Sequence, residues 1–85
     1  MYYNLVEKLK YKLEDIKDDF SIGKTLPIFA EFEAEKLLKK AKDILHVYKE
    51  NNINDDEFLE GLNCVINQIN QFLIDIKDFT NTKSI

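Results

Sequence analysis

The chain has 85 residues, and a length of this order supports one domain, because so small a fold buries only about 60–65% of its unfolded surface. Apolar residues make up 45% of the sequence against 2 glycines and 1 proline, which favours helices over sheets. The formal net charge is −4, and every basic residue is a lysine. Because the arginine fork that reads phosphate and guanine is missing, we expect no nucleic-acid partner.

The single cysteine excludes an intramolecular disulfide framework and suits a reducing compartment. No apolar run approaches the roughly 20 residues that span a bilayer, and the first residues do not form a signal peptide. We therefore expect a soluble, cytoplasmic protein with no membrane partner.

The first helix is predicted over residues 4–20, where apolar residues recur with the spacing of one helix face. These residues are Leu5, Val6, Leu9, Leu13, Ile16 and Phe20. Gly23 follows in a short polar connection, where glycine suits the left-handed backbone that ends many helices. The first helix should therefore stop shortly before this glycine.

The second helix is predicted over residues 26–50. Thr25 is the expected N-cap, and Pro27 falls in the first turn, where a missing N–H has no consequence. Its apolar stripe comprises Leu26, Ala30, Ala34, Leu37, Leu38, Ala41, Ile44, Leu45 and Tyr48. The alanines in this stripe should allow close approach of a bulkier neighbouring helix.

The third helix is predicted over residues 55–79, with Asn54 as its N-cap and three carboxylates at residues 55–57 facing the positive end of the helix dipole. Apolar residues recur along it at alternating spacings of four and three, which is a heptad pattern. This seam consists of Phe58, Leu62, Val65, Ile69, Phe72, Ile76 and Phe79. Residues 80–85 should form a short polar tail.

Short connections make consecutive helices antiparallel, so the sequence predicts an all-α, up-down-up bundle of three helices in a single domain spanning residues 1–85. The alternative is a helical hairpin that completes its core by pairing the seam of the last helix with a second copy. Either fold buries the seam of residues 58–79.

The chain offers few groups for catalysis. His46 lies off the apolar stripe and is interpreted as a surface histidine, and Cys64 has no second cysteine or histidine near it in sequence. Most carboxylates stand one turn from a lysine, and no phosphate loop or calcium loop is present. We expect no enzymatic activity, no cofactor and no metal site.

Three apolar residues depart from the pattern of a simple surface helix. Ile28, Phe29 and Phe32 lie away from the main stripe of the second helix. They are either covered by the first helix or exposed to a partner. The sequence leaves these two interpretations open.

Carboxylates should gather at one end of the bundle, where the first and third helices end and the second begins. They are Asp15, Asp18, Asp19, Glu31, Glu33, Glu35, Asp75 and Asp78. Such residues around apolar side chains can capture a basic partner, although acidic surfaces also serve solubility alone. The carboxylates near the ends of the first and third helices interact unfavourably with the helix dipole, which lowers stability by about 0.3–1 kcal/mol each.

The outer face of the third helix is predicted to carry amides and no charge. Asn63, Asn67, Gln68, Asn70 and Gln71 lie there beside Cys64 and Ile74. Charge depletion is typical of interface centres, so this face is a further candidate for docking a protein.

These patterns favour a small protein that works by binding another protein. In size, acidity and helical make-up the chain resembles the small immunity proteins of colicins and contact-dependent inhibition toxins, and the acidic helix opening at residues 54–58 is compatible with this class. The resemblance implies a bacterial immunity protein or antitoxin that neutralises a basic toxin, such as a nuclease, by occupying its positive cleft. The alternative function is a homodimeric structural or regulatory module.

From the surface argument, the expected contacts with the partner are Asp15, Asp18, Asp19, Ile28, Phe29, Glu31, Phe32, Glu35, Asp75 and Asp78.

Overall fold

The computed structural model describes the backbone of residues 2–83 and the side chains of residues 4–80. It contains α1 (Tyr2–Ser21), α2 (Pro27–Glu50) and α3 (Asp56–Lys83), and the described residues form no strand. The helices build an elongated bundle of 48 × 19 × 16 Å in which every pair of helices is in contact. The predicted all-α, three-helix architecture is confirmed.

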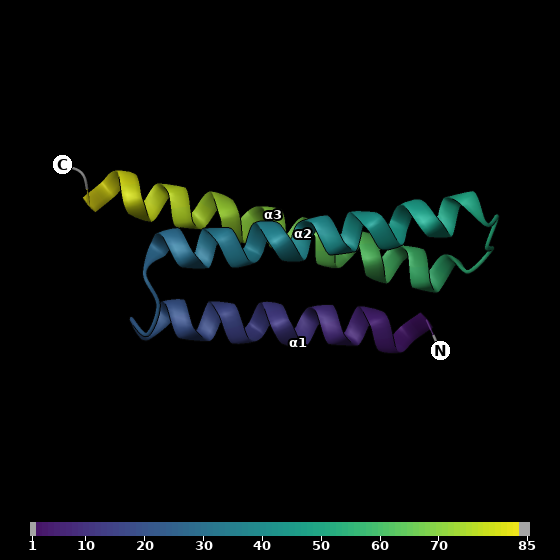
Figure 1. The fold of residues 1–85 in the computed structure, drawn as a ribbon, viewed down its shortest axis with the longest axis horizontal. Coiled ribbons are helices and arrows are strands. Elements are labelled where there is room, and N and C mark those ends of the chain that lie inside the picture. The colour runs from purple at the N-terminus through teal and green to yellow at the C-terminus, as the bar shows by residue number, and fades with distance from the viewer. Residues whose placement is uncertain (1, 84–85) are drawn as a thin grey trace.

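The helices run up, down and up, so that α1 and α3 point the same way (Figure 1). The end of α1, the beginning of α2 and the end of α3 therefore lie together, on the left in Figure 1. We call this the distal end of the bundle. The opposite end holds the beginning of α1 and the connection between α2 and α3.

The seam of α3 is the centre of the core. Six of its seven residues are buried, and Leu62, Val65 and Ile69 have no exposed surface. On α1 they are met by Val6, Leu9 and Leu13, and no polar or charged residue is buried among the described residues. The seam is thus covered within one chain, and no second copy is needed to bury it.

Small residues on α2 let that helix approach the seam closely. Ala30, Ala34 and Ala41 are buried to 1% exposure or less. At the distal end the seam finishes in aromatic contacts, because the Phe20 ring meets Phe72 at 5.8 Å and Phe79 at 5.3 Å between ring centroids, both edge to face. Such pairs contribute about 0.5–1.5 kcal/mol beyond their buried area.

The connection between α1 and α2 agrees with the prediction at Gly23 and differs from it at the N-cap of α2. Gly23 has φ +75°, in the left-handed region that favours glycine. The N-cap of α2 is Leu26, with no side-chain cap, and Pro27 is its first residue. The prediction that Thr25 is the N-cap is therefore wrong. Leu26 is also 61% exposed, since it lies beyond the end of the covered stripe.

The connection between α2 and α3 is fixed by a tyrosine. Asn52 takes the left-handed conformation with φ 52°, as expected for an asparagine there. The N-cap of α3 is Asp55 in place of Asn54, because its Oδ1 accepts a hydrogen bond from Phe58 N at 3.1 Å. The buried Tyr48 hydroxyl accepts from Asp55 N at 2.7 Å and donates to Asp55 O at 2.9 Å. It thereby holds the capping residue from both sides.

Replacing Tyr48 by phenylalanine removes both hydrogen bonds and leaves the ring in place. We expect the free energy of unfolding to fall by about 1–2 kcal/mol, because each net hydrogen bond contributes about 0.5–1.5 kcal/mol. Thermal melts followed by circular dichroism measure the change. The control is Tyr11→Phe, since Tyr11 is 67% exposed. Equal melting temperatures for the two variants would refute the bracing role of Tyr48.

Helix α3 continues beyond the predicted end at residue 79, as far as Lys83. At the start of this extension the Thr80 hydroxyl donates to the Ile76 carbonyl at 2.9 Å. Residues 80–83 of the predicted polar tail are therefore helical, and residues 84–85 lie outside the described residues.

Candidate protein-binding surface

The question that the sequence left open at Ile28, Phe29 and Phe32 is answered by their exposure. The three side chains are 69%, 58% and 57% exposed, and we call them the apolar patch. They lie in the first two turns of α2, at the distal end (Figure 1). Ile28 and Phe32 are four residues apart and share one face of the helix, opposite the buried alanines. The first helix does not cover them.

A lysine partly shields the patch. The Lys36 ammonium lies 5.4 Å from the centroid of the Phe32 ring, a cation–π contact that the sequence reasoning missed. The signal for it was the four-residue spacing of these two residues on a helix. Phe32 remains more than half exposed despite this contact, so its ring is still available to a partner.

The distal end carries the excess negative charge of the molecule. Residues 15–36 and 70–83 hold eight carboxylates and five lysines, a net charge of −3 out of the formal −4 of the whole chain. All eight carboxylate side chains are exposed except Glu31, which is half-buried. The field at this end is therefore negative, with lysines interspersed.

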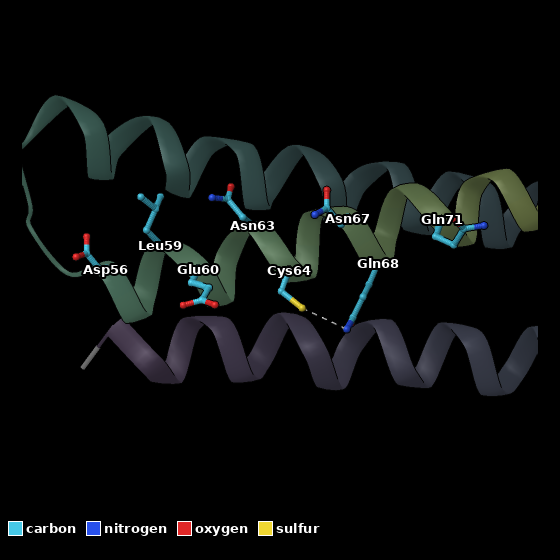
Figure 2. A pocket seen from close by; sticks show the side chains of 8 residues that line it. All are labelled: Asp56, Leu59, Glu60, Asn63, Cys64, Asn67, Gln68 and Gln71. Atoms are coloured by element: carbon cyan, nitrogen blue, oxygen red, sulfur yellow. Dashed lines mark hydrogen bonds between the residues drawn. The ribbon is translucent and has the colours of Figure 1, made fainter.

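The carboxylates differ in how they are placed around the apolar patch. Glu31 and Glu35 each follow a patch residue by three positions on α2, so they border it directly. Asp78 lies on the same side of α3 as Asn67, eleven residues earlier, and Figure 2 shows Asn67 directed toward α2. Of these three residues, Glu31 and Glu35 are the best placed to act with the patch.

Other predicted contact residues lie farther round the bundle. Asp75 is on the side of α3 that carries Cys64, which points toward α1 in Figure 2, and Gln71 Nε2 donates to its Oδ1 at 3.0 Å. Asp15 lines a groove between α1 and α2. Asp18 and Asp19 are exposed in the last turn of α1. The ten predicted residues thus share one end of the molecule but do not form one flat face.

The amide face of α3 forms a shallow, open depression of about 630 Å³. Its residues all come from α3, with Asp56 and Glu60 at one end and amides along the rest (Figure 2). Gln68 Nε2 lies 3.6 Å from Cys64 Sγ. Because one helix alone supplies the walls, the depression can be covered by a partner surface but does not enclose a small molecule.

The two residues that the sequence singled out for reactivity both lie on the surface. His46 is exposed, and its Nε2 lies 3.0 Å from Oε1 of Glu50, which is also exposed and lies one turn later. Cys64 is an exposed free thiol. Within the described residues, no group of His, Cys, Asp or Glu side chains is arranged to hold a metal ion.

Comparison with known proteins adds no relative. No protein-family model matches the sequence, and no curated protein or solved structure matches it either. Among the helices described, none combines the length and the apolar character needed to cross a membrane.

Proposed function

We propose that this protein binds a basic partner protein through its distal end and blocks the surface that it covers. The observation that supports the proposal is the exposure of Ile28, Phe29 and Phe32 beside Glu31 and Glu35. Apolar side chains that lose their water on binding provide most of the affinity of protein interfaces. Surrounding negative charge raises the rate of encounter with a positive surface.

The most specific form of the proposal is an immunity protein or antitoxin whose partner is a toxin with a positive cleft, such as a nuclease. Such a cleft is built to hold phosphates, and carboxylates on a rigid helix can occupy the same positions. The resemblance in size, acidity and helical make-up supports this class. In this function the protein inhibits stoichiometrically, so one copy should abolish the activity of one toxin molecule.

A homodimeric structural or regulatory module is the second candidate, and the apolar patch itself favours it, because two copies could cover each other there. Analytical ultracentrifugation over a range of concentrations separates the two functions. A monomer near 10.0 kDa at all concentrations supports the inhibitor. A dimer that Phe29→Ala and Phe32→Ala convert to monomer supports the module.

Charge reversal at the distal end tests the role of the carboxylates. Replacing Asp18 and Glu35 by lysine should weaken binding of the partner by about 10-fold or more, because attraction becomes repulsion. The thermal melt should change little, since both residues are exposed. Titration calorimetry with the partner recovered from the source cells measures the affinity.

The control for this experiment makes the same change in net charge elsewhere. Glu7→Lys with Glu60→Lys alters two exposed carboxylates away from the distal end. If this control weakens binding as much as the distal pair does, binding depends only on the net charge of the whole protein. The proposed surface is then wrong.

A further inference from the structure

Four lysines converge on the groove between α1 and α2. Lys8, Lys12 and Lys40 line a depression of about 270 Å³ in this groove. Lys12 and Lys40 also line the adjoining depression of about 190 Å³, together with Lys36. We call the groove bordered by these four residues the lysine groove.

Lysines stand on both walls of this groove. Lys8 and Lys12 are one turn apart on α1, and Lys36 and Lys40 are one turn apart on α2, so positive charge lines both walls. None of the four forms an ion pair with a carboxylate of the described residues. Asp15 and Glu33 line the same two depressions, so their lining has a net charge of +2 in a chain whose net charge is −4, and this positive excess favours a negatively charged occupant.

The floor and one end of the lysine groove are apolar. Leu9 and Leu37 are buried beneath it, and Leu5 and Ile44 continue into a third depression of about 260 Å³ that also includes the exposed Val47. Because the three depressions share lining residues, they follow one another along the two helices. An occupant therefore meets apolar surface along its length and, on both sides, lysines interspersed with three carboxylates.

We propose that the lysine groove binds an acidic amphipathic helix of a partner protein. A helix placed here packs as the fourth member of a bundle, with its apolar stripe on Leu5, Ile44 and Val47 and its carboxylates toward the lysines. This binding site lies outside the apolar patch and goes beyond the proposed function.

A helix suits the groove better than a nucleic acid does. Phosphates bring no apolar surface to cover the floor, and the chain has no arginine to grip them. Asp15, Glu33 and Asp43 also stand on the groove walls, where they repel a continuous phosphate backbone. A helix can place uncharged residues opposite these three carboxylates, because its charges are discrete.

The test uses a fluorescein-labelled synthetic peptide of about 16 residues, long enough for about four helical turns, with leucines along one stripe and glutamates on its flanks. Fluorescence anisotropy with the full chain should show saturable binding. Lys12→Glu with Lys40→Glu should weaken it about 10-fold or more. The control is Lys39→Glu with Lys42→Glu on the exposed outer face of α2, which should leave the affinity unchanged.

Further measurements guard against misfolding and simple charge effects. Lys12→Gln with Lys40→Gln should weaken binding in the same direction, and all variants should keep the helical signal and melting temperature of the wild type. A peptide with glutamine for glutamate should bind more weakly. The proposal is overturned if both lysine-to-glutamate pairs weaken binding equally, if the peptide does not bind, or if a single-stranded oligonucleotide binds the groove more tightly.

The result is separable from the proposed function. The variant Phe29→Ala, which keeps the contact between Phe32 and Lys36, should bind the acidic peptide as the wild type does, and the Lys12 and Lys40 variants should still bind the basic partner. If the wild type binds only the acidic peptide or only the basic partner, the proposal for the other surface is wrong.

Discussion

Replacing Ile69 by alanine is expected to lower the free energy of unfolding by about 2–5 kcal/mol, because it removes buried methyl groups and leaves a cavity. Ile69 has no exposed surface and lies in the middle of the α3 seam, where α1 and α2 both pack. Domains are stabilised by only about 0.05–0.15 kcal/mol per residue, so this change removes a large part of the total.

Urea unfolding followed by circular dichroism measures the loss. Ile74→Ala is the matched control, since Ile74 lies on the same helix and is 51% exposed. The control should change the stability by less than about 0.5 kcal/mol. Equal effects of the two substitutions would show that the seam is not covered by the other helices.

Replacing Phe29 and Phe32 together by alanine is expected to weaken binding of the basic partner by about 100-fold or more. Interface residues that become fully desolvated contribute about 2 kcal/mol or more each, and aromatic residues are prominent among them. Because both rings are more than half exposed in the free protein, the fold should lose little stability, apart from about 0.5–1 kcal/mol for the contact with Lys36.

Val47→Ala is the control for the apolar patch. Val47 is 54% exposed and lies three residues before the end of α2 at Glu50. That end of α2 is opposite the distal end of the bundle (Figure 1). Its replacement should leave affinity for the basic partner unchanged. A double variant that binds the partner as tightly as the wild type would remove the patch from the interface.

The fold could be predicted from hydrophobic spacing because one stripe of each helix enters a common core. The seven-residue seam on α3 identified six residues that are buried, and the alanines of α2 identified where that helix approaches. Short connections then favoured the up-down-up arrangement, because they make consecutive helices antiparallel. These features are local in sequence, and the structure confirms them.

The sequence was less informative where two chemically suitable residues adjoin. Both Asn54 and Asp55 can cap a helix, and the choice of Asp55 depends on Tyr48, seven residues away. The exposure of Ile28, Phe29 and Phe32 depended equally on the position of α1, which no local pattern gives. The convergence of four lysines on one groove likewise requires the pairing of α1 with α2.

The central claim is that the distal end holds a basic protein. It is tested most directly by affinity capture from the source cells, followed by quantitative mass spectrometry. The three baits are the wild type, the double variant Phe29→Ala with Phe32→Ala, and the single variant Val47→Ala. We predict that a basic protein is enriched on the wild type and on Val47→Ala and is lost from the double variant. If no basic protein shows this pattern, the distal end is not the binding surface proposed here.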